Sequence, residues 1–551
     1  MAHVCSYFTK RPHVAGGEQN KKLGEYIRDK WLSYKFDHVE MVQYDVLLSM
    51  PPRDKPNVVK ILNTTDGSAL WKVQGPEKIA EPSENDSLVL PPFLGYSPPG
   101  NVSDADLLYA NYGTVKDFQI QNAEKCGAAG VLLYSDPADN SPEGMNNTFP
   151  KTWWLPGTGT ERGTLSFSEG DPLIPLLPSI DGIYRISKTD PEALLPKIPA
   201  QVITYDNAVE FLKRLKGDPV PPGWKGGLKH RIYKFGPGFT DSNLKVRLEV
   251  NNQFVTKPAF NVIEDAWVFG GVDPSSGTAV MMEVSRGVGE LLTKTDWRPR
   301  RTIVFCSWGA EEYGLMALMN GWKKTKTCLS DRAVMYFNVD SAVVGNYSFG
   351  ADGNPSLKSL VYQESALVKD PNAHDKETSL YDRWSSRYPS SSSPGKPSFG
   401  GLGSGSDYAP FSHFIGVPSI DMEYRFKSMN ISYYTVYHTV HDTFYWQKTF
   451  NDPHFTTHLS MSQVGARILL EAADTRILPY NLTDYKEALK SNLAALETHY
   501  KSLLLKGNVT LDHLAREVRN FSRNADAFEQ RKAEASDTQD FAKNYACSMT
   551  R

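Results

Sequence analysis

Two adjacent glutamates, Glu311 and Glu312, form the chemically most informative pair in the sequence. They follow the apolar run 301–307, which predicts a β-strand. Because successive side chains at a strand end point to opposite sides, the two carboxylates can act separately. One can bind a metal ion while the other transfers a proton.

Three further polar side chains complete a set that is typical of a hydrolytic metal site. Asp273 lies in a glycine-rich turn, Asp340 follows an apolar run, and His438 lies in an aromatic loop. Carboxylates and imidazole together are ligands of catalytic zinc. A single acid or a lone histidine is usually structural, so only the combination favours a metal. We interpret the nearby His441 as an ordinary loop residue.

The composition is that of a folded globular protein. The chain has 551 residues, of which 22% are charged, and a formal net charge of -3. This length allows roughly two to four domains. The sequence has no long basic run, which argues against nucleic acid or an anionic membrane as a partner. A small molecule or a peptide is the expected ligand.

The spacing of the cysteines and the N-glycosylation sequons are informative about the cellular compartment of the protein. The five cysteines include no Cys-x-x-Cys motif and predict neither a disulfide framework nor a cysteine-based zinc site. Nine Asn-x-Ser/Thr sequons indicate a glycoprotein of the secretory pathway. However, residues 1–10 contain no visible apolar signal, and no stretch of about 18 apolar residues exists. We favour a product whose signal or anchor is missing over a cytosolic protein with inherited sequons.

The expected secondary structure changes in character along the chain. Residues 1–55 predict a helix and then a strand, and residues 56–237 predict short strands between turns, which favours an inserted β-rich domain. From residue 238, strands and helices alternate, which predicts an α/β sheet flanked by helices. The expected strands are 39–48, 130–134, 200–204, 245–250, 301–307 and 333–339, and the expected helices are 21–34, 207–215, 277–292, 456–473, 484–505 and 510–535.

A series of ordered motifs carries a family resemblance. The motifs are Asp265-Ala-Trp-Val-Phe-Gly-Gly-Val-Asp-Pro-Ser-Ser-Gly277, Ser307-Trp-Gly-Ala-Glu-Glu-Tyr-Gly314, Asn338-Val-Asp-Ser341, Leu402-Gly-Ser-Gly-Ser-Asp407 and Tyr437-His-Thr439. In this order they resemble glutamate carboxypeptidase II and the NAALADase-like zinc peptidases, whose fold the transferrin receptor shares. The resemblance runs through essentially the whole chain.

The resemblance implies a three-part α/β architecture. A di-zinc aminopeptidase-type catalytic domain, with a mixed sheet flanked by helices, is expected at residues 1–55 and 238–476. A protease-associated apical domain is expected at 56–237. A helical dimerisation domain, truncated in this chain, is expected at 477–551.

The resemblance also implies a role for each site residue. Asp273 would bridge two zinc ions, Glu312 and His438 would complete one site, and Asp340 would belong to the other. Glu311 would be the general base. The remaining expected residues are Ser404, Gly405 and Tyr437 in the substrate pocket and Asp265 behind the metal ligands.

The sequence departs from the family pattern at several places. Ile263 stands where the family has a zinc-binding histidine, and a strand-turn-strand segment is missing between Val262 and Asp265. A second gap follows Phe118, and the family continues beyond Arg551. This pattern indicates a variant with internal deletions, such as a splice variant, in which the second zinc site is impaired.

Specificity is expected to differ from that of glutamate-preferring members. Asp421 and Glu423 occupy positions where those enzymes have arginines, which favours neutral or basic peptides. We expect a zinc-dependent exopeptidase of the carboxypeptidase or dipeptidase type that hydrolyses small peptides through a metal-activated water. The alternative is a catalytically silent, receptor-like ectodomain that binds a partner or dimerises with the intact form. The full-length form is expected to be a membrane-anchored homodimer at the extracellular face or in the secretory lumen.

Overall fold

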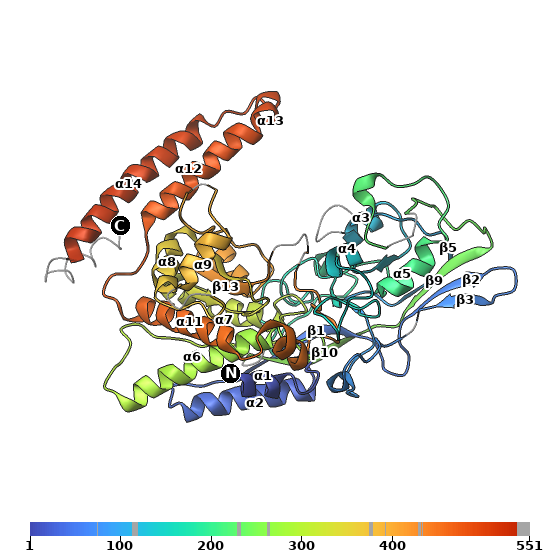
Figure 1. The fold of residues 1–551 in the computed structure, drawn as a ribbon, viewed down its shortest axis with the longest axis horizontal. Coiled ribbons are helices and arrows are strands. Elements are labelled where there is room, and N and C mark those ends of the chain that lie inside the picture. Colours follow the sequence, from blue (N-terminus) through green and yellow to red (C-terminus); the bar gives the residue numbers. More distant parts are fainter. Residues whose placement is uncertain are drawn as a thin grey trace.

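The computed structural model describes residues 1–73, 75–112, 119–228, 233–261, 265–373, 378–391, 393–427, 431 and 433–536. A body rich in helices and a β-rich region lie side by side, and a helical hairpin projects from the first (Figure 1). Ile263 and the two sequence gaps, after Phe118 and after Val262, fall outside the described residues.

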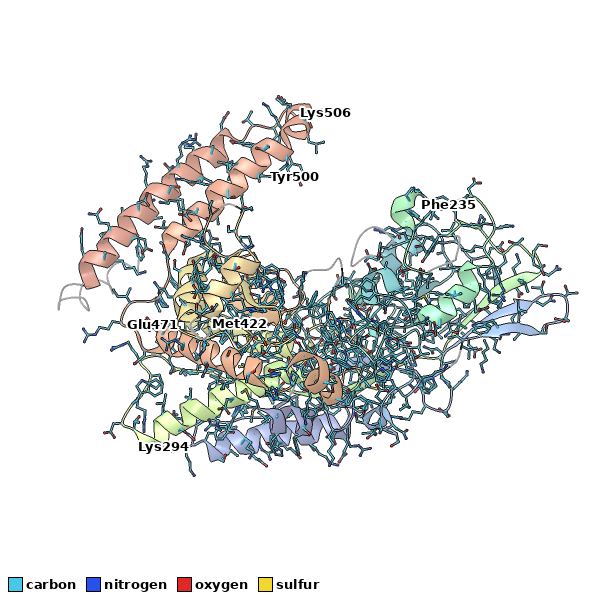
Figure 2. The ribbon with its side chains drawn as sticks, viewed as in Figure 1. Phe235, Lys294, Met422, Glu471, Tyr500 and Lys506 are labelled. Atoms are coloured by element: carbon cyan, nitrogen blue, oxygen red, sulfur yellow. The ribbon has the colours of Figure 1, made fainter. Side chains whose placement is uncertain are left out.

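A small mixed sheet with helices around it forms the centre of the helical body. The strand order is β11-β13-β12, with β11 parallel and β12 antiparallel to β13. The bounds are β11 Tyr336–Asn338, β12 Ser348–Gly353, β13 Ser419–Arg425, α6 Ser275–Lys294, α8 Lys358–Ala366, α9 Leu380–Arg387 and α11 Thr456–Asp474. Met422 of β13 is 1% exposed and lies inside this body, while Lys294 and Glu471 lie toward its edge (Figure 2). The α/β class expected from the sequence is therefore confirmed.

The helical periodicity of α6 explains its place against this sheet. Val280, Val284 and Val288 recur at helical spacing and are all buried. The helix α6 contacts α11, and Val280 and Val284 belong to the same core as Trp384. The helices expected at 277–292 and 456–473 are confirmed as α6 and α11.

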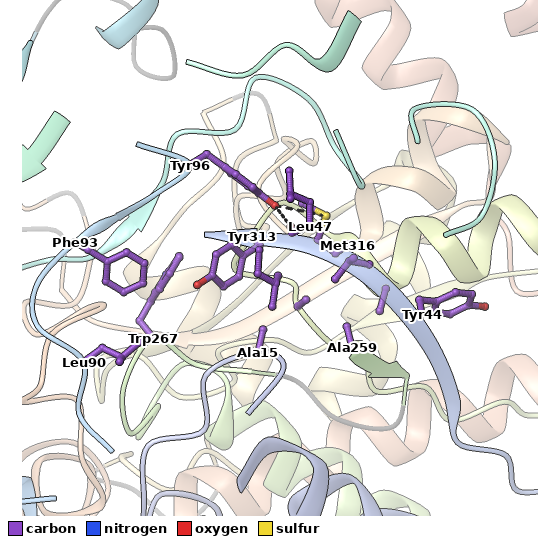
Figure 3. Close-up of a cluster of buried hydrophobic side chains, with 14 of the residues drawn as sticks. Ala15, Tyr44, Leu47, Leu90, Phe93, Tyr96, Ala259, Trp267, Tyr313 and Met316 are labelled. Atoms are coloured by element: carbon purple, nitrogen blue, oxygen red, sulfur yellow. Dashed lines mark hydrogen bonds between the residues drawn. The ribbon is translucent and has the colours of Figure 1, made fainter. Parts of the chain in front are cut away.

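A second core lies under the N-terminal elements. The bounds here are α1 Ala2–Phe8, α2 Glu18–Ser33, β1 Val42–Met50, β10 Gln253–Asn261 and α7 Met316–Arg332. The strands β1 and β10 form an antiparallel pair that α7 contacts. The Tyr96 hydroxyl donates to the Leu47 carbonyl at 2.6 Å inside this core (Figure 3). Tyr313, next to the glutamate pair, donates to the Ser49 carbonyl at 2.9 Å.

The β-rich region contains a four-stranded antiparallel sheet in the order β3-β2-β9-β5. The bounds are β2 Val58–Asn63, β3 Ala69–Lys72, β4 Leu94–Gly95, β5 Gly100–Ala105, β6 Val131–Leu133, β7 Gly163–Thr164, β8 Ala200–Val202, β9 Leu244–Val250, α3 Gln119–Lys125, α4 Pro137–Asn140 and α5 Tyr205–Leu212. The strand β9 follows the predicted boundary at residue 237, yet it pairs with β2 and β5. The division of the chain into domains stays a prediction.

The last described elements form the projecting hairpin. After the short α10 Phe444–Trp446 and α11, the chain continues into α12 Leu482–His499, α13 Lys501–Lys506 and α14 Asp512–Ser536. Tyr500 and Lys506 lie at the end of the hairpin that is far from the body (Figure 2). Within the described part of the chain, none of the helices combines the length and hydrophobicity needed to cross a membrane.

The prediction of a strand at residues 301–307 is wrong. The described residues contain no strand that pairs with this segment, and its Val304 is 71% exposed. The segment is instead tied to the end of α11, where the Arg301 amide donates to the Ala473 carbonyl at 2.9 Å. An apolar run becomes a strand only when a neighbouring strand satisfies its backbone groups, and here none does so.

Candidate metal centre

Three side chains from distant parts of the sequence converge on one point. The His438 Nε2 atom lies 2.9 Å from Glu312 Oε2 and 3.3 Å from Asp273 Oδ2. One potential ligand atom from each residue lies within 4.8 Å of the other two, and the described residues form no other such group of three. The three side chains are between 5% and 12% exposed. The structure therefore brings together three of the four metal ligands expected from the sequence.

The loop before α6 is fixed by Asp442. Its carboxylate accepts the backbone N–H of Val272 at 2.8 Å and that of Asp273 at 3.4 Å, and the Tyr434 hydroxyl at 2.9 Å. The Gly271 amide donates to the Asp442 carbonyl at 3.0 Å. Asp273 is thus held against the same loop that carries His438.

The glutamate pair lies in a tight turn that leads into α7. The Glu311 carbonyl accepts from the amides of Gly314 and Leu315 at 2.7 and 2.8 Å. Glu312 faces His438, whereas the pKa of Glu311 is raised well above its ordinary value by burial and then by the charges of Asp340 and Asp407. Glu312 therefore pairs with His438, whereas the strongest charges on Glu311 are those of Asp340 and Asp407, and the two glutamates lie in a turn and do not follow the expected strand.

His438 presents its Nε2 atom to the carboxylates in a fixed orientation. Its Nδ1 atom lies 3.1 Å from the Arg162 carbonyl, which can accept only if Nδ1 carries the proton. In the neutral ring this leaves Nε2 with the lone pair that a metal needs. Burial acts to lower the pKa of His438, but the Glu312 and Asp273 carboxylates raise it well above its ordinary value.

The centre meets the chemical requirements of a zinc site. His438 Nε2 and Glu312 Oε1 are buried and make no hydrogen bond of regular geometry among the described residues, although Nε2 lies 2.9 Å from Glu312 Oε2. Buried polar atoms usually make well-aligned hydrogen bonds, so this arrangement suits a cation placed between the three side chains. Two carboxylates and one imidazole leave a fourth position open in a tetrahedral zinc shell. The residues present therefore fit a zinc ion.

Asp340 lies beside this centre, but its carboxylate accepts a hydrogen bond from a serine. The Ser406 hydroxyl donates to Asp340 Oδ2 at 2.6 Å, and the side-chain amide of Asn338 donates to Ser406 Oγ at 3.0 Å. Neighbouring Asp407 is buried, and burial together with the charges of Asp421 and Asp273 raises its pKa to about 8. The structure thus places Asp340 outside the group formed by Asp273, Glu312 and His438.

A cavity of about 220 Å³ opens beside Asp273 and Asp340. It is lined by Asp273, Asp340, Ser341, Gly405, Ser406, Tyr408, Asp421, Glu423, Tyr433 and Tyr437. Arg425 is not among the lining residues, but its guanidinium binds Asp352 at 2.6 Å and the lining residue Glu423 at 2.9 Å. Burial and the Glu423 charge raise the pKa of Asp421 to about 7. The described lining is acidic and aromatic.

The other expected site residues divide between the cavity and its surroundings. Gly405 and Tyr437 line the cavity, whereas Ser404 is exposed and outside the lining. Asp265 is 2% exposed, and burial followed by the Glu312 charge raises its pKa well above its ordinary value.

Sequence reasoning assigned no role to Asp407, Asp442 or Arg162. Asp407 closes one of the family motifs, so a signal for it existed. The contact of Arg162 with His438 spans 276 positions and leaves no local pattern.

Comparison with known proteins finds extensive similarity to peptidases. Residues 255–452 match the model of peptidase family M28. The chain is 36% identical to the aminopeptidase NAALADL1 of Rattus norvegicus, over 95% of this chain and 77% of that protein. It is 34% identical to a glutamate carboxypeptidase 2 homologue of Caenorhabditis elegans, over 89% of this chain and 70% of that protein. A zinc aminopeptidase from Bacillus subtilis aligns with a TM-score of 0.48 at 15% identity, over 87% of this chain and 96% of that one, which supports no further conclusion.

Proposed function

Because this chain belongs to peptidase family M28, a family of metallopeptidases, we propose that it is a zinc-dependent exopeptidase acting on small peptides. The observation that carries the proposal is the convergence of Asp273, Glu312 and His438 within 4.8 Å. Such a group of acids and imidazole, largely buried and facing an open cavity, is costly for a fold to maintain without a cation.

Each site residue receives a role in this proposal. Asp273, Glu312 and His438 would hold zinc, which when bound supplies a Lewis acid and lowers the pKa of water. Glu311, whose pKa is raised by burial and by Asp340, would take a proton from water and give it to the leaving amine. Asp340 would contribute to a second, weaker zinc position, as in the family pattern of two zinc ions.

The charge of the cavity favours recognition of a free amino terminus. Asp273, Asp340, Asp421 and Glu423 line it, and although Arg425 binds Glu423 from behind, the described lining itself contains no lysine or arginine. A carboxylate of a substrate would be repelled there, whereas an ammonium group would be attracted. We therefore propose that the enzyme prefers neutral or basic residues and removes them from the amino end, in place of the carboxypeptidase direction expected from the sequence. NAALADL1, which carries the name aminopeptidase, supports this direction.

A second candidate function rests on the metal ligands. Asp340 is bound by Ser406, and the sequence has Ile263 where the family has a histidine. If these departures leave the second zinc position empty, the chain would be catalytically silent and would act as a receptor-like ectodomain that binds a partner or dimerises with the intact form.

We also propose a cellular setting from the family resemblance and the sequons. The full-length form would be a glycosylated homodimer on the extracellular face of a membrane or in the secretory lumen. The exposed hairpin of α12 and α14 would contribute to the dimer.

Hydrolysis of a small peptide panel tests the proposed activity. The panel contains Lys-Ala, Ala-Ala and Glu-Ala, each with a free and with an acetylated amino terminus. We expect zinc-dependent cleavage of the free forms in the order Lys, Ala, Glu, and no cleavage by Glu311→Gln. Cleavage of the acetylated forms would instead support the carboxypeptidase direction. No cleavage by the wild type would favour the silent, receptor-like candidate.

A further inference from the structure

His438 is held by a segment that lies 276 positions away in the sequence. Its Nδ1 atom donates to the Arg162 carbonyl at 3.1 Å, and the Arg162 amide donates to the His438 carbonyl at 3.1 Å. The two residues thus exchange a side-chain and a backbone hydrogen bond. His438 also adopts φ = 57°, a conformation that a non-glycine residue keeps only when its surroundings enforce it.

Arg162 is fixed in turn by a fully buried ion pair. Its Nη2 atom lies 2.6 Å from Glu77 Oε2, and the two side chains are 0% and 1% exposed. Arg162 Nη2 also donates to the Leu90 carbonyl at 3.1 Å, and Nη1 to the Thr160 carbonyl at 3.3 Å. The guanidinium therefore has little freedom to move.

Glu77 also binds the loop that carries His438. Its Oε1 atom accepts the backbone N–H of Val440, two positions after His438, at 3.2 Å. The same atom accepts the Thr160 amide at 2.9 Å. His438 and Val440 are therefore both tied to the pair formed by Glu77 and Arg162.

We propose that Glu77 and Arg162 are positioning residues of the metal centre: the β-rich segment supplies a buried clamp that fixes the tautomer and direction of the His438 ring. The inference rests on the proposed zinc site. A buried ion pair often adds little stability compared with apolar residues of the same size. Its physical contribution here is orientation, since groups that orient a metal-binding imidazole commonly change metal affinity by about 10- to 100-fold.

A matched control lies in the same loop. Glu84 binds His441 Nδ1 at 2.7 Å, and both side chains are 0% exposed. Glu84 also comes from the β-rich segment, but it does not contact His438 or Arg162 in the described structure. Glu77→Gln and Glu84→Gln thus each remove one buried charge that links the same two parts of the chain, and only the first touches the clamp.

Zinc affinity, measured by competition with a chromophoric chelator, tests the proposal on the full chain. We expect Glu77→Gln to weaken zinc binding by about 10- to 100-fold and Glu84→Gln to change it by less than about threefold. If both variants lose thermal stability equally and bind zinc equally well, the clamp is purely structural and the proposal fails. If Glu77→Gln does not fold, the double replacement Glu77→Leu with Arg162→Met restores an apolar pair and is measured in its place.

A second readout needs no zinc. Nitrogen-15 NMR of the histidine side chains in metal-free protein, with His438→Gln for assignment, reports how fast the Nδ1–H of His438 exchanges with water. We expect a slowly exchanging Nδ1–H in the wild type and in Glu84→Gln, because it is hydrogen-bonded to the Arg162 carbonyl, and faster exchange in Glu77→Gln. An unchanged exchange rate in Glu77→Gln overturns the clamp, whereas a wild type that shows the clamp but binds no zinc overturns the proposed function alone.

Discussion

Replacing Gly277 by alanine should displace the backbone that carries Asp340. An added Cβ atom would lie 1.8 Å from the Asp340 carbonyl oxygen and 2.2 Å from that of Val339, while real Cβ contacts stay above 3.0 Å. The obstacle is backbone, which cannot rotate away, so a shift on the order of 1 Å is needed. Overpacking of this kind costs roughly 1–3 kcal/mol and sometimes more. We expect the upper end, about 3 kcal/mol, partly offset by about 1 kcal/mol from the helix preference of alanine.

The same helix contains a control for this prediction. A Cβ atom added at Gly287 meets nothing within 4 Å, so Gly287→Ala should stabilise α6 by about 1 kcal/mol. The free energy of unfolding from urea titration, together with zinc affinity, is measured for both variants. We expect Gly277→Ala to be less stable than the wild type and to bind zinc more weakly, because a shift of α6 also moves the ligand Asp273, two residues before the helix. Equal stability of the two variants would refute the close packing of α6 against the strand end at Asp340.

Three further predictions concern pH, specificity and metal removal. Burial lowers the pKa of His13 from 6.5 to about 4, so as the pH falls the unfolded chain takes up a proton before the folded chain does. The folded state therefore loses stability between pH 6.5 and pH 4. His13→Asn should reduce this loss by roughly 3 kcal/mol, measured as the free energy of unfolding from urea titration across pH. Asp421→Asn removes a carboxylate that is charged above a pH of about 7, and at pH 8 it should raise kcat/KM for Glu-Ala relative to Lys-Ala by about fivefold. An unchanged ratio would show that this carboxylate does not face the substrate. Removing zinc by chelation should lower the free energy of unfolding by about 2.7 kcal/mol relative to protein at a free zinc concentration of 100 times Kd, and calcium should not restore it.

The sequence predicts elements best where the signal is local. The spacing of Val280, Val284 and Val288 predicted a helix, and α6 contains it. The run 301–307 has the composition of a strand but lacks a neighbouring strand among the described residues, and a strand depends on a partner that its own residues cannot specify.

The candidate site could also be predicted from the sequence only in part. Glu312 and Asp273 lie in recognisable motifs, so their roles could be proposed from the sequence. Their grouping with His438 within 4.8 Å depends on how the segments before α6, α7 and α10 meet, which no local pattern encodes. The clamp of Glu77 and Arg162 joins residues 85 positions apart to a loop nearly 280 positions further on, and only the fold reveals it.

The zinc content of the purified chain tests the central claim most directly. After dialysis against metal-free buffer, zinc per chain is measured by atomic emission for the wild type, Glu312→Gln and Asp340→Asn. The grouping of Asp273, Glu312 and His438 predicts one tightly bound zinc in the wild type, its loss in Glu312→Gln and its retention in Asp340→Asn. A wild type without zinc, or a Glu312→Gln variant that retains it, would contradict the assignment of this centre.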